Sequence, residues 1–184
     1  SMNDTDEDVF GVKANNRTYG SKGIQSVANI TFGKQTFNDI EIGFRYHEDY
    51  EDRFQWVDKY AIQNQEMIRT TVARKGSDSN VINSAETIAT YVLYKFTWNN
   101  LTITPGLRYE NMTLTREDFG KNDSDRTGVD FVTRENKVDV FIPGIGANYK
   151  FYPDVSVFGG IHRGFAPPGN KEGTDPEESL NFEL

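Results

Sequence analysis

The sequence contains no cysteine. This absence excludes disulfide bonds, thiolate metal sites and a cysteine nucleophile, although it does not define the compartment in which the protein works. Histidine is also scarce, with two in 184 residues, and no serine lies in a strained turn motif. Because nucleophilic catalysis would have so little to work with, we do not expect an enzyme, and the sequence predicts neither a cofactor nor a resident metal.

Long runs of one kind of residue are missing as well. No run of Lys and Arg is present and the formal net charge is -8, which argues against nucleic acid as a partner because phosphate binding needs a basic surface. No stretch approaches the roughly 18 consecutive apolar residues of a transmembrane helix. A transmembrane β-barrel is still allowed, since each of its strands needs only about 10 alternating residues.

Aromatic residues are what the sequence does have. They make up 13% of the chain while all hydrophobic residues together make up 36%, with 13 Phe and 9 Tyr. The apolar content is therefore carried more by rings than by Leu and Ile. This balance is typical of barrels that have aromatic girdles and a polar interior.

The alternating pattern is clearest around a tight turn in the C-terminal third. Before it, Phe141, Ile145 and Tyr149 alternate with glycine, asparagine and lysine, the period of two expected of a strand whose faces meet different media. The turn is Tyr152-Pro153-Asp154. Alternation resumes at Val155 and ends where two prolines prevent further pairing, so the segment predicts a β-hairpin.

Similar alternation recurs along the chain. In residues 40–47, Ile, Ile, Phe and Tyr lie on one face and Glu, Gly, Arg and His on the other. Pro105-Gly106 and Pro143-Gly144 usually indicate turns, but the apolar phase continues across both, so we expect locally irregular strands there, such as bulged ones. In all we expect seven strands: 27–32, 40–47, 87–97, 101–110, 141–151, 155–161 and 179–184.

The connections between these strands alternate in length. They are short at 33–39, 98–100 and 152–154, and long at 48–84, 117–136 and 165–178, where part of 48–84, such as 67–72, extends the flanking strands; residues 1–23 are expected to be loop. Short turns alternating with long loops are the signature of an outer-membrane barrel. The predicted fold class is all-β: an antiparallel up-and-down meander that is a partial segment of a large transmembrane β-barrel.

A soluble β-sandwich or meander, acting as a β-rich binding or adhesion module, is the alternative. The two differ in what surrounds the apolar faces. A soluble module would bury the faces of Ile42, Phe44, Ile103 and Tyr149 in one closed core, whereas a barrel wall exposes them to lipid.

The two ends of the sequence predict that residues 1–184 are one segment of a longer protein. Residues 1–6 lack the basic, apolar and cleavage regions of a signal peptide, and Ser179–Leu184 begins an alternating strand that simply stops. Seven strands are also too few, and odd in number, for closure. Open strand edges would pair with other strands or with a second copy.

Several motifs together resemble the barrel of TonB-dependent outer-membrane receptors, most closely the ferric-citrate receptor-like branch. The matching pieces are Ile40-Glu-Ile-Gly-Phe-Arg-Tyr-His-Glu-Asp49, Leu101-Thr-Ile-Thr-Pro-Gly-Leu-Arg-Tyr-Glu110, Pro143-Gly-Ile-Gly-Ala-Asn-Tyr149, Gly164-Phe-Ala-Pro-Pro168 and Pro176-Glu-Glu-Ser-Leu-Asn-Phe-Glu-Leu184. The resemblance implies about 22 strands around a plugged lumen. It implies an outer-membrane receptor that binds a ferric chelate, a siderophore or ferric citrate, and imports it with energy coupled through TonB. The implied partners are the plug domain, TonB and outer-membrane lipid, and no segment of the chain looks like the plug.

Ligand candidates follow from polarity and position. Ferric citrate and many siderophores are anionic, and guanidinium groups bind carboxylates in a bidentate manner. The predicted ligand-binding residues are Arg53, Arg69, Arg163, His162 and Arg108, and the predicted lumen-facing polar residues are Arg45, His47 and Glu110.

Each of these predictions has an alternative. Lumen salt bridges to Glu41, to Glu110 or to the plug explain Arg45 and Arg108 better than ligand contacts do, so Arg53 and Arg69 are the stronger ligand candidates. The stretch from His47 to Asp52 has the carboxylates to ligate a hard cation, but a solvated acidic strand end is the favoured interpretation.

Overall fold

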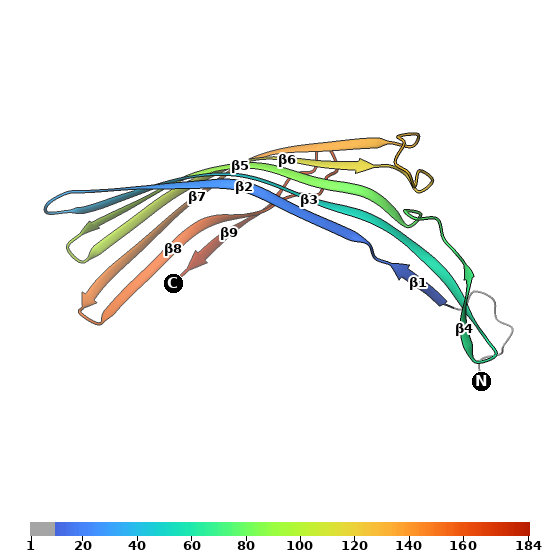
Figure 1. Cartoon of the computed structure of the whole chain (residues 1–184). Coiled ribbons are helices and arrows are strands. Elements are labelled where there is room, and N and C mark those ends of the chain that lie inside the picture. The colour runs from blue at the N-terminus through green and yellow to red at the C-terminus, as the bar shows by residue number, and fades with distance from the viewer. Residues whose placement is uncertain (1–9) are drawn as a thin grey trace. The chain divides into compact units, whose positions relative to one another are not determined.

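The computed structural model describes residues 10–184, and every regular element in that range is a β-strand (Figure 1). Alternating side chains and the aromatic and β-branched content of the chain favour strands throughout. The part of the chain that the structure describes holds no helix that would cross a bilayer. The nine strands are β1 (Phe10–Ala14), β2 (Arg17–Phe32), β3 (Phe37–Gln63), β4 (Glu66–Thr71), β5 (Ser79–Trp98), β6 (Leu101–Asp118), β7 (Val132–Tyr152), β8 (Val155–Ala166) and β9 (Glu177–Glu183).

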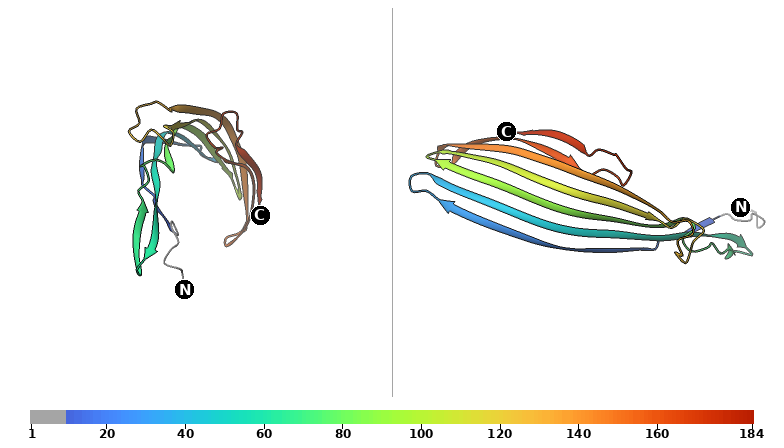
Figure 2. Two further views of the ribbon diagram at one scale, coloured as in Figure 1. Left: turned by 90° about the vertical axis from the view of Figure 1, so that its right-hand side faces the viewer. Right: turned by 90° about the horizontal axis from the view of Figure 1, so that it is seen from above.

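The strands form one sheet, in which the strands from β5 to β9 lie side by side in sequence order (Figure 2). The order is β1-β3-β5-β6-β7-β8-β9, with β2 and β4 also paired to β3. The β1–β3, β3–β4, β7–β8 and β8–β9 pairs are antiparallel. Because β9 pairs with β8 and no other described strand, the sheet does not close, which confirms the predicted open all-β meander.

The chain divides into two compact units. Of the described residues, the first unit contains 10–21, 49–84 and 115–134, and the second contains 22–48, 85–114 and 135–184. Several strands pass through both units, so each unit is described separately below.

Several segments predicted to be loops are strands. Residues 1–9 lie outside the described residues, but 10–14 and 17–23 belong to β1 and β2. The predicted loop 48–84 is largely strand, because β3 runs on to Gln63, β4 forms a hairpin with it and β5 begins at Ser79. The loop prediction was wrong there because charged residues such as Asp52, Arg53 and Asp58 interrupt the apolar positions of this segment, so the alternation typical of a strand is weak.

The short turns and the continuation of strands through both prolines are confirmed, whereas the local irregularity expected at Pro105 and Pro143 stays a prediction. β7 and β8 are joined at residues 153–154 and β5 and β6 at 99–100. Strands β6 and β7 continue through Pro105 and Pro143. In the β7–β8 pair the register is regular from Gly144 to Lys150 and shifts between Lys150 and Tyr152, next to the turn.

Candidate functional site

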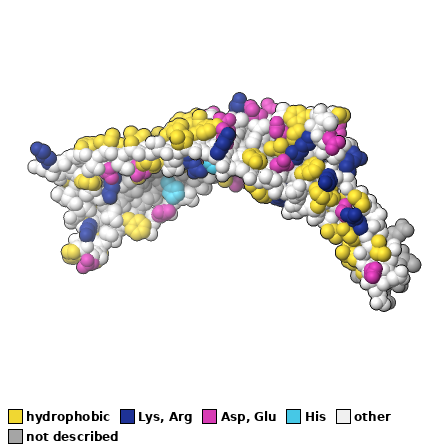
Figure 3. Space-filling view, viewed as in Figure 1, with side chains coloured by type: hydrophobic (Ala, Val, Ile, Leu, Met, Phe, Trp, Pro, Cys, Tyr) yellow, Lys and Arg dark blue, Asp and Glu magenta, His cyan; other side chains and the backbone are white. Residues whose placement is uncertain are grey.

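The sheet of the second unit has one apolar face that is exposed. Ile42 is 48% exposed, Phe44 43% and Tyr149 44%, and hydrophobic side chains gather in a band over these strands (Figure 3). A soluble module would bury these side chains in a closed core, and the structure leaves them exposed. We call this surface the apolar face; it also contains Ile30, Phe32, Leu107, Phe141, Ile145, Val157, Leu180 and Phe182.

The opposite face of the same unit is polar, and side chains from three strands meet there. The Tyr91 hydroxyl on β5 donates a hydrogen bond to Glu41 on β3 at 2.6 Å. On β6, Arg108 Nε donates to Glu110 Oε1 at 2.5 Å. This polar face therefore contains the Arg108–Glu110 salt bridge that the sequence favoured over a ligand contact.

A hollow of about 670 Å³ lies on the polar face and has glycines in its floor. Gly106, Gly144 and Gly160 come from three successive strands, and a Cβ on Gly144 would lie 3.0 Å from the Cβ of His162. Arg108 and His162 both line the hollow. The structure thus brings two of the predicted ligand residues to the same hollow.

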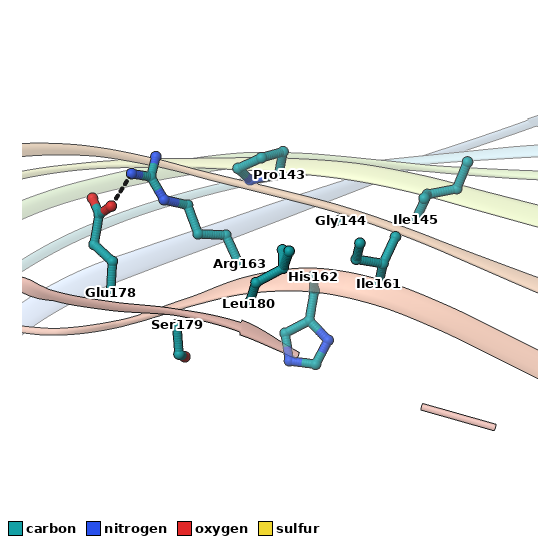
Figure 4. A pocket seen from close by; sticks show the side chains of 9 residues that line it. All are labelled: Pro143, Gly144, Ile145, Ile161, His162, Arg163, Glu178, Ser179 and Leu180. Atoms are coloured by element: carbon teal, nitrogen blue, oxygen red, sulfur yellow. Dashed lines mark hydrogen bonds and ion pairs between the residues drawn. The ribbon is translucent and has the colours of Figure 1, made fainter. Parts of the chain in front are cut away.

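Arg163 and His162 are neighbours in sequence but lie on opposite faces of β8. Cross-strand pairing sets His162 opposite Gly144 and Arg163 opposite Leu180. In Figure 4, His162 points to one side of the strand, while Arg163 and Leu180 point to the other. Arg163 forms an ion pair with Glu178 and donates to the Phe141 carbonyl oxygen at 3.2 Å, so it shares the apolar face.

Arg45 and His47 alternate with Phe44 along β3, which places them on the face opposite that aromatic ring. Phe44 is on the apolar face, so both side chains lie on the polar face, as does Glu110 through its bond to Arg108. Whether this face lines a lumen stays a prediction.

In the first unit, Arg53 belongs to a network around one carboxylate. Glu51 accepts hydrogen bonds from Arg53 Nε at 2.7 Å, from Arg17 Nη1 at 3.0 Å and from the Tyr19 hydroxyl at 3.1 Å. The bond from Arg53, supported by Tyr19 and Arg17, lowers the pKa of Glu51 below its usual value. Two guanidinium groups share one carboxylate, so the three charges sum to a net positive charge.

Sequence reasoning missed Arg17 and Tyr19, because their segment gave no alternating pattern. Assigning residues 17–23 to a strand would have found them, since β2 pairs with β3 and thereby brings Arg17 and Tyr19 to Glu51. Arg69, the other strong ligand candidate, lies 3.4 Å from Asp58 Oδ2. Asp58 also accepts the Ala73 backbone N–H at 2.8 Å, so it fixes the chain after β4.

A second network missed from sequence surrounds Arg126, in the loop at residues 119–131. Its Nη1 and Nη2 donate to the two carboxylate oxygens of Asp52 at 2.9 and 2.6 Å, and its Nε donates to Asn80 at 2.9 Å. The guanidinium also lies 4.8 Å from the ring centroid of Phe119 and 5.2 Å from that of Phe54. Bidentate pairing and cation–π contacts together hold this loop against β3 and β5.

The acidic stretch from His47 to Asp52 is divided among separate cations. Glu48 pairs with Lys22 at 2.7 Å, while Glu51 and Asp52 take part in the two networks above. Within residues 10–184, no three His, Cys, Asp or Glu side chains gather as they would around a metal ion. Glu48, Glu51 and Asp52 are thus engaged in ion pairs with Lys22, Arg17, Arg53 and Arg126.

An open antiparallel meander with one exposed apolar face and one polar face defines a partial segment of a membrane-type β-barrel wall. The chain belongs to the TonB-dependent receptor-like β-barrel family, whose model matches residues 2–184. This family consists of outer-membrane receptors and transporters rather than enzymes.

Among solved structures, the chain is similar to the ferric citrate transporter FecA in its unliganded form. The TM-score is 0.75 and the sequence identity is 15%, and the match covers 94% of this chain and 25% of that one. The chain therefore spans about a quarter of the length of that transporter, and the likeness establishes the fold. The search of curated proteins gave no significant match.

Proposed function

We propose that residues 1–184 form part of the barrel wall of a receptor in the bacterial outer membrane that binds a ferric chelate and imports it with TonB-coupled energy. The observation that carries the proposal is the exposed apolar face backed by a polar one, in a chain of this receptor family. A plug domain and TonB act as partners through the full-length receptor, and outer-membrane lipid surrounds the apolar face.

The substrate class is an anionic ferric chelate, either ferric citrate or a siderophore. Arg17 and Arg53 support it, because they bring two guanidinium groups to one carboxylate and Arg53 pairs through Nε alone. The terminal nitrogens of Arg53 take no part in that ion pair and have the geometry to bind a carboxylate. Arg69 is the second candidate in the first unit, and Arg108 and His162 are candidates on the polar face of the second.

The proposal is tested on the full-length receptor in lipid. Binding of ferric citrate and of ferric siderophores is measured by quenching of tryptophan fluorescence, and growth of iron-starved cells on each chelate is measured with and without TonB. We expect one chelate class to bind and to support TonB-dependent growth. If no ferric chelate binds, or if growth is independent of TonB, the proposal is wrong.

Arg53→Ala tests the ligand residue. A charged hydrogen bond contributes about 1.5–3 kcal/mol, so we expect Kd to rise about 10- to 100-fold. Arg134→Ala is the matched control, because Arg134 is also an exposed arginine in a strand of the first unit. An equal change of Kd in the two variants would show that Arg53 does not bind the ligand, and it would leave the proposed transport function untouched.

A further inference from the structure

All seven strands of the second unit change character at one point on the apolar face. At the end of each apolar stretch that lies away from the short turns, a polar side chain stands two residues beyond the last apolar one, after it on β3, β6 and β8 and before it on β2, β5, β7 and β9. For example, Glu48 follows Tyr46 on β3, and Asp139 precedes Phe141 on β7. We call this set the polar belt; it contains Lys22, Glu48, Glu86, Asn111, Asp139, Arg163 and Glu178.

Contacts across β2, β3 and β5 place the first part of the belt at one level. Lys22 Nζ lies 2.7 Å from Glu48 Oε2. The Tyr46 hydroxyl donates to Glu48 and lies 3.3 Å from Glu86 Oε1. Lys22 to Glu48 joins β2 to β3 and Tyr46 to Glu86 joins β3 to β5, so the belt crosses the sheet rather than running along a strand.

A second group of contacts continues the belt over β6 to β9. The Tyr109 hydroxyl donates to Asp139, and Asn111 Nδ2 donates to the same oxygen at 2.8 Å. Arg163 connects β8 to both neighbours, through the Phe141 carbonyl oxygen on β7 and the Glu178 carboxylate on β9. Four strands thus share one row of polar contacts.

The apolar stretches between the belt and the short turns have the length of membrane-spanning strands. A tilted strand needs about 9–11 residues to cross the hydrocarbon layer. Leu101–Tyr109 on β6 and Phe141–Phe151 on β7 have this length, and both end next to a short turn. Leu107 and Phe141, within these stretches, are exposed.

We propose that the polar belt marks the outer edge of the membrane hydrocarbon, with its side chains in the lipid headgroup layer and the apolar face below it in contact with acyl chains. The inference rests on the proposed function, because it takes the apolar face to be the lipid-facing wall of the receptor. Tyr46 and Tyr109 sit immediately below the belt, where an amphipathic ring keeps its hydroxyl in the polar layer. Arg163 then lies in the lipid headgroup layer and does not bind the ligand.

Single cysteines in the full-length receptor, with any other cysteines removed, test the position of the belt. Glu86→Cys and Asn111→Cys lie in the belt, and Leu107→Cys and Val157→Cys lie on the apolar face. Each thiol is labelled on intact cells with a membrane-impermeant maleimide. In phosphatidylcholine vesicles, a bimane attached to each thiol is quenched with lipids that carry a nitroxide at a shallow or a deep position.

We expect the belt cysteines to react with the maleimide and to be quenched by the shallow nitroxide. We expect Leu107→Cys and Val157→Cys to stay unlabelled and to be quenched by the deep one. Deep quenching at both belt positions, or maleimide labelling at both apolar positions, would overturn the inference. A variant that fails to fold is identified by the loss of the heat-dependent gel shift, and the second variant at the same level then decides the result.

The outcome is independent of the substrate. If no ferric chelate binds but the labelling pattern is as expected, the transport proposal fails and the membrane boundary stands. If a chelate binds but the pattern is uniform, the boundary is wrong and the transport proposal stands.

Discussion

Gly43 is a position where the fold leaves no space for a side chain. A Cβ built there would lie 1.9 Å from the Tyr91 ring, and this ring is held in place by the hydrogen bond from its hydroxyl to Glu41. Close approach of a neighbouring aromatic side chain, rather than an unusual backbone conformation, is therefore the reason for glycine at this position of β3.

Gly43→Ala is expected to destabilise the folded receptor by about 1–3 kcal/mol, since overpacking displaces the ring. The free energy of unfolding is measured by urea titration in lipid vesicles. Tyr91→Ala removes the ring, so the alanine at position 43 should cost much less in that background. An equal cost in both backgrounds would show that the ring is not the obstacle.

Asp123 organises the loop at residues 119–131 through its carboxylate. One oxygen accepts the Thr127 backbone N–H at 2.9 Å and the Thr127 hydroxyl at 3.1 Å, and the other accepts the Gly128 N–H at 2.7 Å. These bonds, led by the Thr127 N–H, hold the pKa of Asp123 below its usual value. The folded loop therefore stabilises the ionised form of the Asp123 carboxyl.

The stabilisation from Asp123 should depend on pH. A carboxyl whose pKa is lowered on folding contributes fully above its unfolded pKa of about 3.9, and the contribution is lost as pH falls through the folded pKa. We expect cleavage of this loop by pepsin to increase as pH falls below about 3.9. Asp123→Asn cannot ionise, so its cleavage should be high and should change little with pH; a rise as steep as that of the unmodified chain would contradict this origin.

At the scale of elements, two buried asparagines hold two of the long connections. Asn80 on β5 is 2% exposed and donates to the carbonyl oxygens of Gly120 and Asp123 at 3.0 and 2.8 Å. Asn136 on β7 is 4% exposed and donates to those of Gly169 and Thr174 at 3.2 and 3.0 Å. In each case a strand residue supplies the donors that the loop backbone needs.

Asn136→Asp should release the connection at residues 167–176. Aspartate has nearly the same shape but no N–H donors, so the Gly169 and Thr174 carbonyl oxygens would face a carboxylate. We expect tryptic cleavage after Lys171 to become several-fold faster. Asn148→Asp, a similar change elsewhere on β7, is the control, and equal cleavage in both variants would show that Asn136 does not anchor the loop.

At the scale of the whole molecule, the exposed apolar face should make the receptor sensitive to charge at a defined depth. Ile145 lies near the middle of the apolar stretch of β7, whereas Asn111 lies in the polar belt. Arginine at a lipid-facing position costs about 2–4 kcal/mol at the bilayer midplane and about 0–1 kcal/mol near the interface. We expect Ile145→Arg to lower the free energy of unfolding in vesicles by about 2–4 kcal/mol and Asn111→Arg to lower it by about 0–1 kcal/mol. Equal losses would show that the two residues do not differ in depth.

The sequence by itself determined the fold class, the tight turns and the two faces of the second unit. It did so because water and lipid on opposite sides of a strand impose an apolar and polar alternation that can be read from residues such as Ile42, Arg45 and Tyr149. The family resemblance was readable for the same reason, since its motifs lie in these strands.

Only the tertiary structure decided the rest. The extension of β3 mixes charged and apolar residues on both faces, so its pairing depends on long-range contacts such as the Arg126–Asp52 ion pair, whose partners are 74 residues apart. The opposite directions of Arg163 and His162 follow from alternation within β8, whereas the contacts that join the polar belt across strands, such as Arg163 to Glu178, exist only in the assembled sheet. Pairing between strands that no short turn connects is a relation between distant segments, and a local pattern in the sequence does not specify it.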